Sequence, residues 1–260
     1  MRGFLVLAAL AGVWSCVDQT PLSPNAQAIV VHAVLDASAH TQYVLVQTTN
    51  GSTPTQKVVS DATVQLLTPD GRALVADYVV DTTYAVGVGN APAVNSFYQL
   101  SLDKYGAALQ PGSTYRLRIA LADGRVVTGS TTIPAAPATA NLNLPASLSS
   151  NDSLALAWPR VAGAIAYDVS VSFKGWPTFD AFADTSIVLS TKTRTSSGGS
   201  AFYAGATYQI VVSAVDVNYY DYYRRSSDFL TGSGPISHLD GAIGVFGAIV
   251  PIASGTVTVQ

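Results

Sequence analysis

The sequence predicts an all-β protein, and three observations support this fold class. The chain of 260 residues contains no glutamate and few lysines, so residues that favour exposed helices are scarce. Val, Thr and Tyr, which favour strands, recur along its whole length. Apolar and polar residues alternate in several runs bounded by turn sequences, which is typical of strands with one buried face.

The first half of the chain is predicted to form one β-sandwich. Its clearest strand is Thr114–Leu121, in which apolar residues such as Tyr115 and Leu117 alternate with polar ones. Two turn sequences, Pro69-Asp70-Gly71 and Asp123-Gly124, indicate hairpins. The expected strands are Ile29–Leu35, Tyr43–Thr48, Ala62–Leu67, Phe97–Leu102, Thr114–Leu121 and Val126–Thr132.

A boundary follows at Ile133–Ser147, which is rich in proline and small residues, and strands resume after it. Glycines in Gly241–Ala248 indicate a buried terminal strand where the backbone makes close approaches. We expect a signal peptide at 1–15, a tether at 16–27, a first sandwich at 28–136 and a second at 137–260. The expected strands of the second sandwich are Leu154–Trp158, Ala166–Phe173, Ile187–Thr191 and Thr207–Asp216.

An internal similarity links the two halves. The sequences "PGSTYRLRI" and "AGATYQIVV" share a glycine, a threonine and a tyrosine before an alternating run. In β-sandwiches, a tyrosine at a strand entrance can hydrogen-bond the adjoining corner. We predict this role, rather than a catalytic one, for Tyr115 and Tyr208.

The N-terminus predicts export and lipidation. Arg2 precedes an apolar segment, Phe4–Val13, of about the length found in signal peptides. The sequence "VWSC" then resembles a bacterial lipobox, in which Cys16, the only cysteine, would become the lipidated N-terminus. An ordinary signal peptide with an incidental cysteine remains the alternative. Stable anchoring would need more than one acyl chain.

An aromatic-rich segment is the main candidate for a binding surface. Roughly 25 residues separate Asp216 from Ala242, which is long for a compact domain. We predict a short helix over Tyr219–Ser226, capped by Asn218, with Tyr219, Tyr222 and Tyr223 on one face. Either this face packs on the sandwich or it binds a ligand, because tyrosine and arginine are enriched at recognition sites. The candidate binding residues are Tyr219, Tyr220, Tyr222, Tyr223, Arg224, Arg225 and, from a predicted aromatic loop, Trp176.

Of these residues, Tyr220, Arg224 and Arg225 are expected to be exposed. No catalytic motif is evident, and no cofactor or metal site is predicted, since the histidines lack ligand spacing and the acidic residues are all aspartate. Calcium binding by loop aspartates stays open. The net charge of −3 without a basic cluster argues against a nucleic-acid partner.

Two segments carry resemblances to known folds. "LALAWPRVAGAIAYDVSV" (Leu154–Val171) and "YAGATYQIVVSAVD" (Tyr203–Asp216) resemble strands of a fibronectin type III domain. "SDATVQLLTPDGR" (Ser60–Arg72) resembles a carboxypeptidase-regulatory or transthyretin-like sandwich. These resemblances imply two sandwiches in tandem, transthyretin-like and then fibronectin type III-like, but they do not imply a function.

The order of motifs also resembles an uncharacterised family of bacterial lipoproteins, the domain of unknown function 4249. This resemblance rests on Cys16, "ATVQLLTPDG", "YDYYR" and "DGAIGVFGA". It implies a lipoprotein of the outer membrane that is associated with a TonB-dependent transport system. Because no catalytic motif is evident, we expect a non-catalytic accessory protein that faces the periplasm or the cell exterior and binds an envelope partner. The alternatives are a glycan- or peptide-binding module and, as a third class, a hydrolase.

Overall fold

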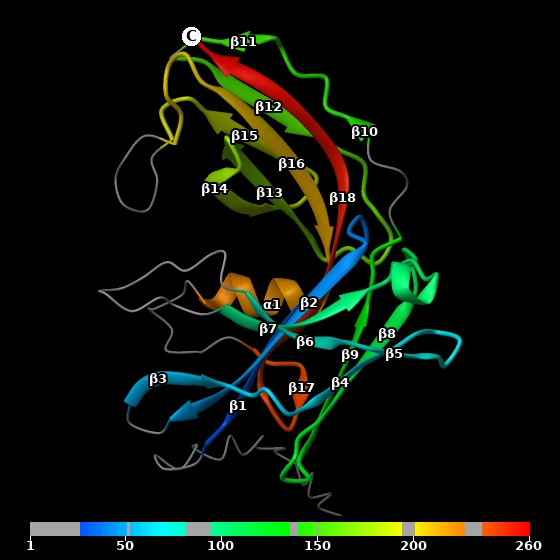
Figure 1. The fold of residues 1–260 in the computed structure, drawn as a ribbon. Helices are drawn as coiled ribbons and strands as arrows, with labels where there is room; N and C mark the ends of the chain where they lie inside the picture. The colour runs from blue at the N-terminus through cyan, green and yellow to red at the C-terminus, as the bar shows by residue number, and fades with distance from the viewer. Residues whose placement is uncertain are drawn as a thin grey trace, which may run out of the picture.

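The computed structural model describes residues 27–50, 53–81, 95–135, 140–149, 151–193, 201–226 and 236–260. Strands make up 58% of the structure and helices 6%, so the all-β prediction is confirmed. Figure 1 shows two strand-rich halves, with the helix α1 (Val217–Ser226) lying where they meet. The predicted signal peptide, Cys16 and most of the predicted tether lie outside the described residues.

The first half is a sandwich of two sheet layers. Tyr98, Leu117, Ile119 and Phe246 are among the buried side chains between the layers. A short helix, η1 (Asp103–Tyr105), follows one of the strands. One layer contains β1 (Ile29–Asp36), β2 (Thr41–Asn50), β3 (Thr53–Val58), β6 (Asp77–Asp81) and β7 (Asn95–Ser101). The other contains β4 (Thr63–Leu67), β5 (Ala73–Val75), β8 (Thr114–Ala120), β9 (Val126–Thr132) and β17 (Leu239–Asp240).

The second half is also layered. Its core contains Trp158, Tyr167, Val169 and Tyr208, all buried. One layer pairs β12 (Ser153–Ala157) with β15 (Ser186–Ser190). The other contains β10 (Ala140–Asn141), β11 (Ser147–Leu148), β13 (Ala166–Phe173), β14 (Trp176–Ala183) and β16 (Thr207–Val215).

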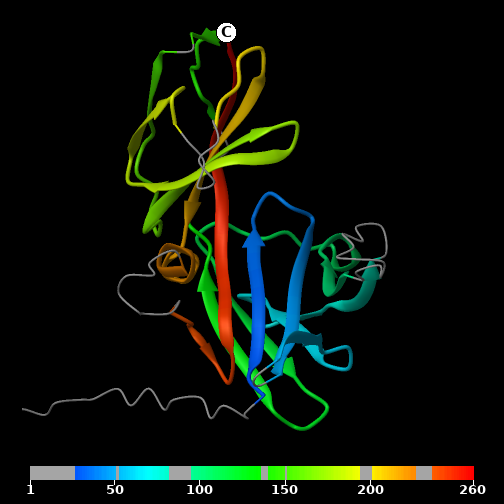
Figure 2. The same ribbon diagram turned by 90° about the vertical axis from the view of Figure 1, so that its left-hand side faces the viewer.

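A single long strand, β18 (Ile243–Val259), belongs to both halves. Its first part pairs in parallel with β1, from Ile243 to Ile249, and its second part pairs antiparallel with β16, from Ile249 to Thr258. Figure 2 shows this strand, in red, running the length of the molecule. Within the described residues, the two halves therefore share one sheet of 11 strands.

Strands β17 and β18 add side chains to the first core, although the predicted boundary at residues 136 and 137 assigns them to the second sandwich. Leu239, Ala242, Phe246 and Ala248 lie in or against the first core, although they follow strands β10 to β16 of the second sandwich in sequence. The boundaries 28–136 and 137–260 remain a prediction as domain limits. The C-terminal segment nevertheless completes the first sandwich.

Glycines allow β18 to approach its neighbours closely, as predicted for Gly241–Ala248. Gly244 has a φ of +122°, and a Cβ built there would lie 1.9 Å from the carbonyl oxygen of Val31. A Cβ on Gly247 would lie 2.8 Å from the backbone nitrogen of Tyr219 in α1. The missing side chains thus let β18 pack against β1 on one side and α1 on the other.

Both predicted tyrosine corners are confirmed. The hydroxyl of Tyr115 accepts a hydrogen bond from the backbone N–H of Gln110 at 2.9 Å, and that of Tyr208 accepts one from Tyr203 at 2.5 Å. Both rings are buried. Each hydroxyl therefore satisfies a backbone donor at a chain corner, which explains why the same short sequence precedes both strands.

The close approach at Gly244 predicts a large effect of Gly244→Ala. The new Cβ would overlap the Val31 carbonyl at a backbone angle that L-residues avoid, so we expect a loss of about 3 kcal/mol or more in unfolding free energy. Gly124→Ala is a matched control, since Gly124 has a φ of +89° and nothing lies within 4 Å of its built Cβ. It should cost only about 1 kcal/mol. Chemical denaturation would measure both, and equal losses would contradict the packing explanation.

Candidate functional site

The helix α1 begins at a buried carboxylate. Asp216, which is only 4% exposed, precedes the helix, and its Oδ1 accepts the backbone N–H of Tyr219 at 2.9 Å. This is the contact that an N-cap residue makes with the third residue of a helix. The prediction that Asn218 caps the helix is wrong. The helix starts at Val217, two residues earlier than predicted, because Asp216 supplies the cap.

The same carboxylate connects three separate elements. Oδ1 also accepts the backbone N–H of Ala248 in β18 at 3.0 Å, and Oδ2 accepts the hydroxyl of Thr131 in β9 at 2.6 Å. The burial raises the pKa of Asp216, while these hydrogen bonds oppose the increase. Asp216 therefore joins the start of α1 to both layers of the first sandwich.

Asn218 has a structural role beside it. Its side-chain amide donates to the carbonyl of Ser130 in β9 at 2.7 Å and to that of Phe246 in β18 at 2.8 Å. The side chain is buried and bridges two backbone groups across the layers of the sandwich. Asn218 therefore fastens the first turn of the helix rather than presenting it to solvent.

Tyrosines on α1 reach into both halves of the protein. The hydroxyl of Tyr219 donates to Asp168 in β13 at 3.0 Å, and the hydroxyl of Tyr223 contacts the Nε2 of His32 in β1. The ring centroids of Tyr219 and Tyr223 are 4.4 Å apart, and those of Tyr222 and Tyr223 are 5.2 Å apart. These three tyrosines form the predicted cluster, and much of that cluster serves packing.

The prediction that three residues of α1 are exposed is confirmed only in part. Arg224 is exposed, as expected, and its guanidinium lies 5.2 Å from the ring centroid of Tyr220. Tyr220 is half-buried rather than exposed, because its ring contacts Phe182 of β14 with 5.1 Å between centroids. The side chain of Arg225 lies outside the described part of the structure.

A groove of about 550 Å³ opens between α1 and the outer face of β13 and β14. Asp168 pairs with Phe182, and Ser170 pairs with Asp180, so these side chains share the face turned away from the second core. Asp168 and Asp180 are thus diagonal neighbours across two strands. The residues lining this junction groove are Asp168, Asp180, Ala181, Phe182, Tyr219, Tyr223 and Arg224.

Desolvation determines the charges in the junction groove. Burial raises the pKa of Asp168 to about 6, although the hydrogen bond from Tyr219 opposes the shift, and the nearby Asp180 adds to it. Desolvation also raises the pKa of Asp180. Burial raises the pKa of Tyr223 to about 12, and burial together with Asp168 raises that of Tyr219. Above pH 6, the groove combines ionised Asp168 with neutral phenols.

Two histidines contact α1: His32 lies beside Tyr222 and Tyr223, and His238 lies beside Asp221. Desolvation lowers the pKa of His32, which favours the neutral ring beside Tyr223. The Nε2 of His238 lies 3.0 Å from the Oδ2 of Asp221 in α1. Asp221 therefore ties the middle of the helix to the chain that leads into β17.

Trp176 does not join this site. The segment predicted as an aromatic loop is a strand, β14, which pairs with β13 along its length. Trp176 pairs with Phe173, five residues along β13 from Asp168, which is roughly 17 Å at strand spacing. Its side chain is 76% exposed and is absent from the groove lining.

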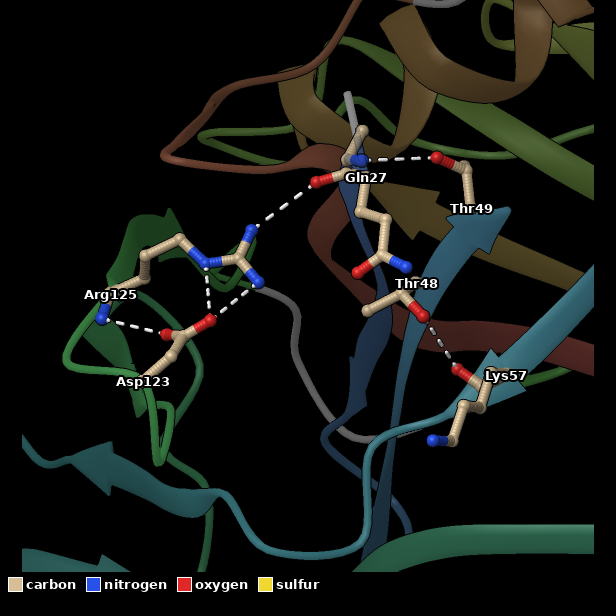
Figure 3. A network of polar contacts seen from close by, with 7 residues as sticks. Gln27, Thr48, Thr49, Lys57, Asp123 and Arg125 are labelled. Carbon is tan, nitrogen blue, oxygen red and sulfur yellow. Dashed lines mark hydrogen bonds and ion pairs between the residues drawn. The ribbon is translucent and has the colours of Figure 1, made fainter. Parts of the chain in front are cut away.

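A second pocket, of about 300 Å³, lies where the described chain begins. Figure 3 shows Arg125 hydrogen-bonded to the carbonyl of Gln27 and to the carboxylate of Asp123. The Arg125–Gln27 distance is 3.2 Å, and the backbone N–H of Ala28 donates to the hydroxyl of Thr49 at 3.0 Å. The hydrogen bonds from Arg125 lower the pKa of Asp123. Within the lining, Arg125 forms an ion pair with Asp123, and the contacts from Arg125 and Thr49 hold residues 27 and 28 against the first sandwich.

The loop aspartates bear on the question of calcium binding. Asp70 forms an ion pair with Arg72, and Asp77 forms one with Lys104, so both carboxylates already have a basic partner. In the described ranges, no group of three or more His, Cys, Asp or Glu side chains is placed to hold a metal ion. Those ranges also contain no helix that is long and apolar enough to cross a membrane.

Sequence reasoning missed Asp168, Asp180 and Phe182, which line the groove. A weak indication was available: Asp168 and Asp180 occupy outward-facing positions in strands, where aspartate is uncommon. Their proximity depends on the pairing of β13 with β14, and β14 was not predicted.

The family comparison covers most of this architecture. A family model described as a domain of unknown function, DUF4249, matches residues 17–251. The chain belongs to this family. The match includes α1, both strands beneath the junction groove and the part of β18 that pairs with β1. No curated protein matches the chain.

The raised pKa of Asp168 predicts a pH-dependent contribution to the stability of this DUF4249 protein. Between its usual 3.8 and about 6, the folded state holds a proton that the unfolded state has lost. Stability should therefore rise as the pH falls from 7 to 4, by roughly 2–3 kcal/mol from this group. Asp168→Asn should remove this rise while still accepting the Tyr219 hydroxyl, whereas exposed Asp103→Asn should keep it. Urea denaturation at pH 4, 5.5 and 7 is the measurement, and an unchanged profile in Asp168→Asn would contradict the assignment.

Proposed function

We propose that this protein is a non-catalytic accessory lipoprotein of the outer membrane that binds an envelope partner through the face formed by α1 and β14. The observation that carries the proposal is the junction groove, where aromatic rings, two aspartates and Arg224 gather beside the helix joining the two halves. Tyrosine and arginine are enriched where proteins recognise each other. The partner class that we propose is a TonB-dependent transport system.

The anchoring and the identity of the modules belong to the same proposal. Residues 1–15 are a signal peptide, Cys16 carries the lipid, and residues 16–27 tether the first sandwich to the membrane. We assign the first sandwich to the transthyretin-like type and the second to the fibronectin type III type. The buried Trp158, which packs on Tyr167 with 5.6 Å between ring centroids, supports the second assignment.

A glycan- or peptide-binding module is the second candidate function. The junction groove has a volume of about 550 Å³, which lies in the range of small-ligand sites. Its carboxylates can accept hydrogen bonds from hydroxyl or amino groups, and Phe182 and Tyr219 offer ring surfaces. These features favour a ligand that carries hydrogen-bond donors beside an apolar surface.

A hydrolase has less support. The described lining of the groove offers aspartates, but it includes neither the serine nor the histidine needed for acyl transfer. Two carboxylates could serve glycoside hydrolysis, but Asp168 is engaged by Tyr219 beneath the helix. We therefore assign the groove a binding role.

Site-directed photocrosslinking would test the partner proposal. A photoreactive amino acid in place of exposed Arg224 should crosslink an envelope protein in the native membrane, since position 224 lies at the groove. The same substitution at Arg116, exposed on β8 of the first sandwich, is the matched control and should crosslink little. Mass spectrometry would identify the product. If position 224 gives no envelope protein and affinity capture of the intact chain recovers none, the proposal is wrong.

The anchor has a separate test. Cys16→Ser removes the thiol that would carry the lipid, so the protein should move from the membrane fraction to the soluble fraction. Fractionation with immunoblotting measures this shift, and Ser15→Ala serves as a control that leaves the thiol in place. Continued membrane association of Cys16→Ser would show that the lipid assignment is wrong.

A further inference from the structure

β14 lies at one edge of the large sheet. In the described residues, it pairs only with β13. An edge strand presents backbone N–H and C=O groups that can pair with an added strand. The start of β14 is less suited to such pairing, because Pro177 lacks an N–H and the register with β13 shifts beside it. The regular stretch is Phe179–Ala183.

This regular stretch lies directly beside the junction groove. Asp180, Ala181 and Phe182 all line the groove, so an added strand would lie along its margin. Alternate side chains of that strand would project to the same face as Asp180 and Phe182. One of them would reach the groove in which Asp168 also lies.

The charges in the groove select the kind of side chain that fits. Asp168 and Asp180 contribute two carboxylates, while Arg224 contributes one guanidinium, which lies over the ring of Tyr220. A lysine or arginine side chain can place its charge near the carboxylates and its apolar stem against Phe182. An acidic side chain would be repelled, and an apolar one would add no positive charge to balance the two carboxylates.

We propose that an extended segment of the partner pairs with β14 along Phe179–Ala183 and places a lysine or arginine side chain between Asp168 and Asp180. This inference rests on the proposed partner-binding function and specifies its chemistry. The backbone pairing supplies affinity with little dependence on sequence, and the basic side chain supplies specificity. Charge complementarity in a partly desolvated groove makes each carboxylate important for the complex.

The pH dependence of Asp168 gives this arrangement a measurable signature. The charged and titratable groups around Asp168 are Asp180 on β14 and Tyr219, Tyr223 and Arg224 on α1. The pKa of Asp168 is about 6, so the carboxylate is ionised above this pH and neutral below it. A cationic side chain binds the ionised form, so affinity should be high at about pH 8 and should fall as the pH drops through about 6.

A defined peptide and the full-length protein in detergent provide the experiment. The probe is acetyl-Thr-Thr-Val-Lys-Val-Thr-Thr-amide carrying a neutral fluorescent label, and fluorescence anisotropy measures its binding. Replacing lysine by norleucine should weaken binding about tenfold or more, and so should Asp180→Asn in the protein. Asp103→Asn, which removes the same charge from the first sandwich, should leave binding unchanged.

Backbone methylation tests the strand addition. An added strand uses alternate N–H groups, so one of two peptides methylated on odd or even amides should lose binding at least about tenfold, and the other should retain it. Equal binding by both would overturn the pairing with β14. Binding of norleucine and lysine peptides with equal affinity, or binding of a neutral hexasaccharide and not the peptide, would overturn the basic-side-chain proposal.

The two proposals can fail separately. In a protein that also carries Asp180→Asn, the photoreactive residue at position 224 should no longer give a crosslinked product with the envelope partner. If the partner is still captured at an undiminished level, it binds in another way, and the partner-binding function stands while this inference falls. If no partner is captured in either background, the proposed function itself falls.

Discussion

The buried carboxylate of Asp216 is the interaction on which the junction between the two halves depends. Burying a carboxylate is costly unless hydrogen bonds satisfy it. Here the N–H groups of Tyr219 and Ala248 and the hydroxyl of Thr131 provide that satisfaction. Because the three donors come from α1, β18 and β9, the carboxylate also sets the position at which the chain leaves β16 and turns into the helix.

The position of α1 then determines what its tyrosines can do. Gly247 allows the backbone of Tyr219 to approach β18, and Tyr219 and Tyr223 extend from the helix to Asp168 and His32 in opposite halves. Tyr219 and Tyr223 therefore contribute to holding the two halves together. The remainder, with the outer face of β13 and β14, forms the junction groove, so the structural and the proposed binding roles share the same helix.

Elements with a local pattern were predictable. The alternation in Thr114–Leu121, the two tyrosine corners and the glycines of β18 all follow from short stretches of sequence, because their physical requirements involve neighbouring residues or backbone geometry. The prediction of Asn218 as the helix cap was wrong because the choice of cap depended on contacts with residues far away in the sequence. Asn218 has the residue type of a cap, but its amide is needed by the carbonyls of Ser130 and Phe246, so Asp216 starts the helix instead.

The sequence by itself determined the all-β class, strands such as β8, β13 and β16, and the presence of a short aromatic helix, because alternation, turn residues and strand propensity act locally. Only the tertiary structure decided that β18 serves both halves, that β14 is a strand and that Asp168 and Asp180 share a groove with α1. These features depend on contacts between residues far apart in the chain. Strand pairing and burial establish such contacts, and no local pattern specifies them.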